Sequence, residues 1–177
     1  RADAVCFGTL ALRSPQSKQA IETLLSFAPK DALRFFDVNL RGNYYSAELI
    51  DELLKKANVF KINDDELEVL KKLFGFSGTV DEVCRAFISR YGLKYMIFTA
   101  GDKFSAIYTP SEKSWLPTPK VKVADTVGAG DSFSGAFVYN ILTGKSLAEA
   151  HKAAVDIAAF VSTKSGAWPA YEKGAEQ

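Results

Sequence analysis

One stretch of the sequence combines glycines with a carboxylate in a pattern suited to phosphate chemistry. Residues 125–137 read D-T-V-G-A-G-D-S-F-S-G-A-F. Gly128, Ala129 and Gly130 have little or no side chain and lead into a predicted helix, so their backbone N–H groups can point at a ligand. The partial positive charge of the helix N-terminus would complete an anion hole for a transferring phosphoryl group. Asp131, in the first helical turn, is placed to accept the proton of an attacking hydroxyl.

Two other interpretations of this stretch stay open at this point. An acidic residue in a first helical turn is common because it suits the helix dipole, so Asp131 alone is not diagnostic. Gly128 and Gly130 also begin like the dinucleotide-binding pattern G-x-G-x-x-G, but the third glycine position holds Phe133. The ribose-binding acid of that pattern would be Glu149, which lies in a helical pattern rather than at a strand end. The sequence contains no Walker A loop.

Other polar residues follow predicted strands. Asp37, Asn39 and Arg41 form a D-x-N-x-R stretch after one strand. The Arg41 guanidinium could hold a phosphate or a sugar oxygen, or it could form a surface ion pair. Asn63 and Glu66 have the spacing of a capping box, in which each side chain binds the other residue's backbone N–H. A helix that starts at a strand end is also where a metal-bound phosphate would sit, so both interpretations can hold.

The elements that must position these residues are short apolar runs alternating with amphipathic segments. We expect strands over 4–7, 33–38, 59–62, 95–99 and 104–108, with one or two more in 115–123. Helices are expected over 15–28, 46–57, 63–73, 80–91, 128–142 and 146–163. Uniformly apolar strands between helices are typical of an α/β fold, with a mostly parallel sheet covered on both faces. Ligands bind beyond the carboxyl ends of such strands, where Asp37, Asn39, Asn63, Gly101 and Gly128 would converge.

Composition excludes several other classes of protein. The 177 residues correspond to about one domain. Lys and Arg number 22 against 21 Asp and Glu, so no basic excess points to nucleic acid or an anionic membrane. No apolar run approaches the roughly 20 residues of a membrane span. Cys6 and Cys84 form neither a disulfide framework nor a zinc spacing, and we expect both to be buried. His151, the only histidine, is expected on a helix surface.

Residues 125–137 resemble the C-terminal signature of the ribokinase/PfkB family of carbohydrate kinases, D-T-x-G-A-G-D-x-F-x-G-A. Four further stretches resemble the family in the same order: 7–13 and 37–41 (its fructokinase-type branch), 61–67 (its N-x-x-E segment), and 166–169 (its closing element). Residues 99–103 resemble its nucleotide loop, T-x-G-x-x-G, although Phe104 replaces the second glycine. The resemblance extends from residue 4 to about residue 170.

The resemblance implies a three-layer α/β/α sandwich and transfer of the γ-phosphoryl group of ATP to a sugar hydroxyl, of fructose or a similar monosaccharide. It implies Asp131 as the general base and the backbone amides of residues 128–131 as the anion hole. The other implied site residues are Arg41 in the catalytic site, and Asn63, Glu66, Thr99, Gly101 and Thr126 at the nucleotide. Glu66 is the implied Mg²⁺ ligand, and some members bind K⁺ near the loop of Asp125.

Complete family members extend further at the N-terminus. We therefore expect residues 1–177 to form the C-terminal portion of a single PfkB-type kinase domain, without the N-terminal strands and the β lid. The expected setting is the cytoplasm, with ATP and a small sugar as ligands and neither nucleic acid nor membrane as a partner. A homodimer of the full-length protein is compatible with this resemblance. The alternative is a fragment that binds nucleotide or another protein and catalyses nothing.

Overall fold

The strands of this chain follow one another across a single sheet in the order of the sequence. The computed structural model describes residues 2–170. The strands are β1 (Ala4–Phe7), β2 (Leu33–Asp37), β3 (Val59–Asn63), β4 (Tyr95–Thr99), β5 (Phe104–Tyr108) and β6 (Lys113–Pro117). Neighbouring strands from β1 to β4 are parallel, and β5 is antiparallel to β4. This arrangement confirms the predicted α/β class and its mostly parallel sheet.

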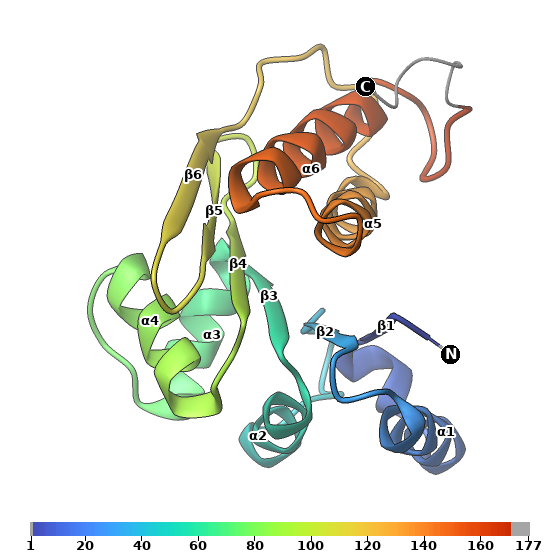
Figure 1. Ribbon diagram of the computed structural model, residues 1–177, viewed down its shortest axis with the longest axis vertical. Helices are drawn as coiled ribbons and strands as arrows, with labels where there is room; N and C mark the ends of the chain where they lie inside the picture. The colour runs from blue at the N-terminus through green and yellow to red at the C-terminus, as the bar shows by residue number, and fades with distance from the viewer. Residues whose placement is uncertain (1, 171–177) are drawn as a thin grey trace. The chain divides into compact units, whose positions relative to one another are not determined.

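The chain divides into two units, Arg1–Trp115 and Leu116–Gln177, which we describe separately. In the first unit, the connections between parallel strands contain a short 3-10 helix and four α-helices (Figure 1). They are η1 (Thr9–Leu12), α1 (Pro15–Phe27), α2 (Ala47–Lys56), α3 (Asp64–Phe74) and α4 (Val80–Tyr91). Because right-handed crossovers between strands in sequential order all pass over the same face, these helices share one face of the sheet.

A row of large side chains crosses that face of the sheet. Phe7, Phe36, Phe60, Met96 and Tyr108 are successive cross-strand neighbours, and all are buried. The first three rings stack pairwise with centroids 5.3 Å apart. The helices add apolar side chains to the same core, among them Leu53, Leu54, Leu70, Val83 and Phe87. The burial of these apolar side chains between the sheet and the helices stabilises the packing of the two layers.

The predicted helix ends are largely confirmed because capping residues define them. Side-chain oxygens of Ser14, Ser46, Asn63, Thr79 and Ser146 each accept a hydrogen bond from the first helical turn that follows. The prediction for 115–123 is only partly right, because among the described residues the strand there covers Lys113–Pro117 and no strand follows in 118–123. Pro117 and Pro119 lack the N–H that a continuing ladder needs.

The second unit consists mainly of two helices, α5 (Ala129–Leu142) and α6 (Leu147–Ser162), packed against each other. His151 lies between them, fully buried, with its ring edge-on to Phe133 at 6.1 Å between centroids. The expected surface position of His151 is therefore wrong. The alanine-rich α6 packs closely on α5 and encloses the imidazole, and this burial lowers its pKa to about 4.

The two cysteines differ in environment. Cys84 on α4 is fully buried in the core, as expected. Cys6 is exposed, so its expected burial is not observed; among the residues that the structure describes, β1 pairs with one strand, β2. Across residues 2–170, no helix combines the length and the apolar character that crossing a membrane would require.

Candidate active site

The glycine-rich stretch forms a tight loop that leads into α5. Gly128 has a φ of +83°, in the left-handed region that favours glycine. A Cβ at this position would lie 2.5 Å from the carbonyl oxygen of Ala167 and 2.8 Å from its Cα. Both the conformation and the close approach of residue 167 therefore require glycine at the start of α5.

Asp125 holds the same loop together. Its Oδ1 accepts a hydrogen bond from the Val127 N–H at 3.0 Å, and its Oδ2 accepts one from the Gly166 N–H at 3.2 Å. These backbone donors hold the pKa of Asp125 below its usual value. A carboxylate offers about four lone-pair positions, so these two hydrogen bonds leave acceptor positions on this half-buried group unused by residues 2–170.

The N-terminal end of α5 carries no side-chain cap. The Ala129 N–H donates to the Thr126 carbonyl at 3.2 Å, so one amide of the predicted anion hole is used in the turn. Within residues 2–170, nothing accepts a hydrogen bond from the N–H groups of Gly128, Gly130 or Asp131. The Asp131 side chain lies exposed in the first turn beside them. An anion placed here would meet free amides and the positive end of the helix dipole.

In the first unit, Glu66 makes two backbone contacts at the start of α3. Asn63 and Glu66 form a capping box, with Asn63 Oδ1 accepting from Glu66 N at 2.8 Å and Glu66 Oε2 accepting from Asn63 N at 2.9 Å. Glu66 Oε1 accepts from Leu40 N at 3.1 Å. Glu66 as a whole is only 6% exposed, and burial raises the pKa of its carboxyl group.

This geometry does not suit Glu66 as a direct ligand of Mg²⁺. Both carboxylate oxygens already accept backbone hydrogen bonds, and the group is buried, whereas bound Mg²⁺ keeps several waters. Among the residues that the structure describes, no three His, Cys, Asp or Glu side chains are grouped so that they could hold a metal ion.

The D-x-N-x-R stretch has one buried and one exposed charge. Asp37 Oδ2 and Lys61 Nζ form an ion pair at 2.6 Å in which both side chains are largely buried. Arg41 is exposed, and its Nη1 donates to the Leu40 carbonyl at 3.0 Å. No acidic side chain within residues 2–170 pairs with Arg41, so the surface ion pair considered from the sequence is not observed there.

Thr99 and Gly101 lie at the turn from β4 to β5. Thr99 is half-buried, with Oγ1 3.5 Å from the Ile62 carbonyl, and Gly101 has a φ of +53° with open space beside it. Phe104 stands where the family pattern has a second glycine, and its ring packs 5.7 Å from that of Phe98 and 5.6 Å from that of Trp115. This position of the loop therefore contributes packing rather than close backbone approach.

The predicted site residues fall into two groups. Asp37, Asn39, Arg41, Asn63, Glu66, Thr99 and Gly101 belong to the first unit, at or just beyond the carboxyl ends of β2, β3 and β4. Residues 125–131 belong to the second unit. Sequence reasoning missed Thr9, which binds Val38 just after β2, and Lys61, which pairs with Asp37 at the end of β2. A threonine two residues beyond a predicted strand is the sequence signal that could have found Thr9.

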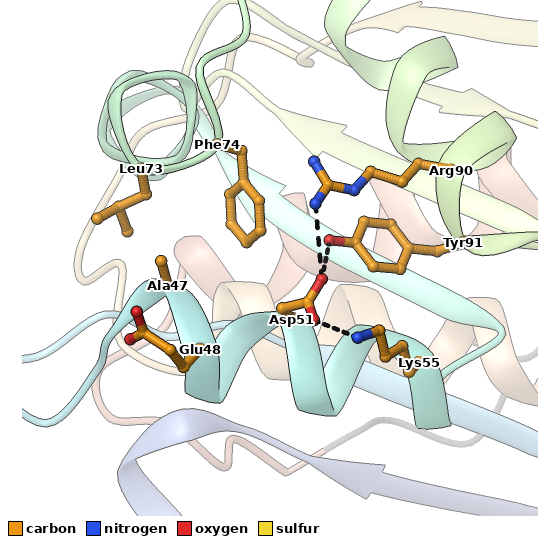
Figure 2. Close-up of a pocket in the computed structure, with 8 residues that line it drawn as sticks. All are labelled: Ala47, Glu48, Asp51, Lys55, Leu73, Phe74, Arg90 and Tyr91. Atoms are coloured by element: carbon orange, nitrogen blue, oxygen red, sulfur yellow. Dashed lines mark hydrogen bonds and ion pairs between the residues drawn. The ribbon is translucent and has the colours of Figure 1, made fainter.

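A separate cavity of about 570 Å³ lies between α2, α3 and α4, and none of these site residues lines it (Figure 2). Three of its charged groups, on Asp51, Lys55 and Arg90, are paired with one another. Asp51 accepts from the Tyr91 hydroxyl at 2.7 Å and pairs with Lys55 Nζ at 2.6 Å. The Arg90 guanidinium lies 5.4 Å from the centroid of the Phe74 ring and 3.8 Å from Asp51. These contacts fasten the three helices to one another.

Comparison with known proteins gives the class of protein. The family model described as pfkB family carbohydrate kinase matches residues 1–173. Fructokinase-2 of Zea mays is 30% identical, over 96% of this chain and 53% of the maize protein. The fructokinase of Vibrio cholerae O395, solved with fructose, ADP and a calcium ion, has a TM-score of 0.79 at 23% identity, covering 94% of this chain and 56% of that one. Aminoimidazole riboside kinase from Salmonella enterica, solved with aminoimidazole riboside and an ATP analogue, has a TM-score of 0.76 at 26% identity, covering 94% and 58%.

The chain therefore belongs to the pfkB family of carbohydrate kinases, and its fold is ribokinase-like. It spans about half the length of most of the curated relatives it matches. The assignment of the chain to the C-terminal part of the domain stays a prediction.

Proposed function

We propose that the protein containing this chain transfers the γ-phosphoryl group of ATP to a hydroxyl of a monosaccharide, in the manner of a fructokinase. The observation that carries this proposal is the uncapped start of α5, where the amides of Gly128, Gly130 and Asp131 have no acceptor among the described residues and lie beside the exposed Asp131 carboxylate. Membership of the pfkB family supports the same activity.

In the proposed reaction, Asp131 acts as the general base. Its carboxylate accepts the proton of the sugar hydroxyl as the hydroxyl oxygen attacks the γ-phosphorus, and the bond from phosphorus to the bridging oxygen of ADP breaks. An exposed carboxylate in the first turn can reach a substrate without moving the helix. A general base of this kind contributes about 10²- to 10⁴-fold in rate.

The amides at the start of α5 form the proposed anion hole. The N–H groups of Gly128, Gly130 and Asp131 stabilise charge that develops on the transferred group, and the Ala129 amide remains in its turn with Thr126. Asp125 keeps the loop in shape through its hydrogen bonds to residues 127 and 166. Such prearranged donors need no reorganisation when the reaction occurs.

The remaining residues have proposed roles toward the nucleotide and the ions. We assign Arg41 to an anionic or sugar oxygen, and Thr99, Gly101 and Thr126 to the nucleotide. Asn63, expected from the sequence at the nucleotide, is instead assigned to capping α3. Mg²⁺ would neutralise charge on the phosphates, held by those phosphates and by water rather than by a direct bond to Glu66. A potassium ion, if required, would bind at the Asp125 loop.

A coupled assay of ADP release tests the proposal. The full-length protein is incubated with ATP, Mg²⁺ and, in separate reactions, fructose, ribose, 2-keto-3-deoxygluconate and nucleosides, with and without K⁺. We expect release that depends on one sugar, with fructose ranked first. ATP binding without release for any substrate would contradict the proposal and favour a non-catalytic, nucleotide-binding protein instead.

A further inference from the structure

The stretch that leads from β2 to Arg41 is held from the β1 side by Thr9. The Thr9 side chain is fully buried, and its Oγ1 donates to the carbonyl of Val38 at 2.7 Å and lies 3.1 Å from that of Asn39. The Thr9 N–H also donates to the Val38 carbonyl, at 3.2 Å. One residue therefore binds two successive carbonyls of a segment about 30 positions further along the chain.

The same stretch is held from the opposite side by β3 and α3. The Val38 N–H donates to the Lys61 carbonyl at 3.2 Å, and Lys61 Nζ is paired with the Asp37 carboxylate at 2.6 Å. Two residues further on, the Leu40 N–H donates to Glu66 Oε1 at 3.1 Å. The second oxygen of Glu66 is fixed by the Asn63 N–H, so this acceptor cannot swing away freely.

Gly8 lets β1 approach the end of β2. A Cβ at this position would lie 2.5 Å from the Asp37 carbonyl oxygen, which is far below contact distance. The φ of Gly8 is −152°, an extended value that any residue adopts, so space rather than conformation requires glycine here. A methyl group at residue 8 would therefore push directly on the backbone of residue 37.

These contacts surround a backbone conformation that needs support. Asn39 has a φ of +46° and is the one non-glycine residue with positive φ among residues 2–170. Such a conformation costs about 1 kcal/mol or more, and asparagine tolerates it better than most residues. It redirects the chain just before Arg41, whose guanidinium is exposed and, among the described residues, donates one hydrogen bond, to the Leu40 carbonyl.

We propose that Gly8, Thr9 and Glu66 are positioning residues that fix the direction in which Arg41 leaves the sheet edge. The clamp that they form fastens the backbone of residues 37–40 on both sides and leaves only the guanidinium free to meet an anionic or sugar oxygen. The proposal rests on the proposed function, because Arg41 has a substrate to meet only if the protein is a kinase.

Thr9 is the clearest residue for a test, because no role in catalysis or in nucleotide binding has been assigned to it. Thr9→Val keeps the shape and the backbone N–H but removes the hydroxyl. Thr9→Ser keeps the hydroxyl and serves as the conservative control. Thr23→Val removes a surface hydroxyl on α1 that binds only within its own helix, and it controls for the chemistry of the substitution. If Thr9→Val does not fold, Gly8→Ala takes its place, because the added methyl group would push on the backbone of residue 37 and disturb the same contacts.

The first arm of the experiment measures hydrogen exchange of the full-length protein by mass spectrometry, without substrate. We expect amide exchange in residues 37–45 to accelerate about 2- to 10-fold in Thr9→Val, the range given by one lost hydrogen bond. Exchange in β4 and α4 should stay unchanged, as should the whole pattern in Thr9→Ser and Thr23→Val. Unchanged protection of residues 37–45 in Thr9→Val would overturn the clamp.

The second arm is a double-mutant cycle on kcat/KM for the sugar. Thr9→Val should lower kcat/KM about 10-fold or more, because small misplacements of a positioned group are costly. In an Arg41→Ala background the same change should cost less than about 2-fold, because the group it positions is gone. Equal losses in both backgrounds would mean that Thr9 serves stability alone, and this would overturn the proposal. If the wild type releases no ADP with any sugar, the proposed function fails instead, and the exchange arm still decides whether the clamp exists.

Discussion

Two helix N-termini in this chain lie beside predicted site residues. One has side-chain caps on its backbone N–H groups, and the other has none. At the start of α3, Asn63 and Glu66 bind each other's backbone N–H, and Glu66 also binds the N–H of Leu40. At the start of α5, Gly128 provides no cap, and amides that find no acceptor within residues 2–170 lie beside the exposed Asp131. At the start of α3, side chains of that helix end accept hydrogen bonds from its backbone N–H groups. At the start of α5, the N–H groups remain available to an anion.

This difference separates two patterns that look alike in the sequence. Both place polar residues where a helix begins after a strand or a loop, and both could be assigned to phosphate binding. The hydrogen bonds show that Glu66 is buried and serves the protein backbone, so the end of α3 is primarily structural. The predictions below test this contrast in order of expected effect.

The largest effect is expected from Asp131→Asn at the uncapped end. Loss of the general base should lower kcat about 10³-fold, within the usual range for such groups. ATP affinity should change little, because the proposed anion hole uses backbone amides. ADP release and calorimetric titration with ATP measure the two quantities. Asp156→Asn, which changes an exposed acid on α6, is the matched control and should leave both unchanged. Retention of most of the turnover in Asp131→Asn would refute the assignment.

Gly128→Ala should damage the same end through the backbone. The added Cβ would collide with the Ala167 carbonyl and displace the amides, so we expect kcat to fall about 10²- to 10³-fold. Gly144→Ala is the matched control, because Gly144 has a nearly identical φ of +82° but nothing within 4 Å of the added atom. It should cost about 1–2 kcal/mol in stability and leave turnover unchanged. Equal turnover in the two variants would show that the loop geometry does not matter.

The packing beneath the uncapped end should make stability depend on pH. His151 has a pKa of about 4 in the folded chain, below its ordinary value of 6.5, because burial disfavours the charged form. Between these values the unfolded chain binds a proton that the folded chain does not, so stability is lost as pH falls from 6.5 toward 4. The loss should approach about 3 kcal/mol.

The midpoint of thermal unfolding across pH 4–7 measures this effect. His151→Gln should be less stable at pH 7 but should show a flatter dependence over the same interval. An unchanged slope in the variant would mean that carboxylates, not the imidazole, cause the acid sensitivity.

The smallest effect is expected at the capped end. Asn63→Ala should lower the free energy of unfolding by about 1 kcal/mol, the usual value for an N-cap. Asn63→Asp should restore it, because the carboxylate oxygen can accept the Glu66 N–H in the same way. Denaturant unfolding measures both. A large loss of ATP affinity in Asn63→Asp, with stability intact, would show instead that this end contacts the nucleotide, contrary to the contrast drawn here.

Local features of the sequence predicted most of the elements, because caps and glycines act on their immediate neighbours. Helix α3 begins after Asn63 and ends before Gly75, and α4 begins after Thr79 and ends before Gly92, as these residue types predict. Long-range contacts could not be predicted in this way. His151 is buried because α6 packs on α5, a contact that the pattern of the helix alone does not reveal. The bond from Leu40 to Glu66 joins residues that only the folded sheet brings together. The motif around Asp131 could be found in the sequence because its glycines and its carboxylate are consecutive residues of one loop and helical turn.

Titration of the full-length, ¹⁵N-labelled protein with a non-hydrolysable ATP analogue tests the central claim most directly. The claim is that the uncapped start of α5, and not the capped start of α3, receives the phosphates. Amide resonances of Gly128, Gly130 and Asp131 should move progressively to saturation, while those of Asp65 and Glu66 stay in place. Saturable shifts at Asp65 and Glu66 with none at Gly128 and Gly130 would contradict the account.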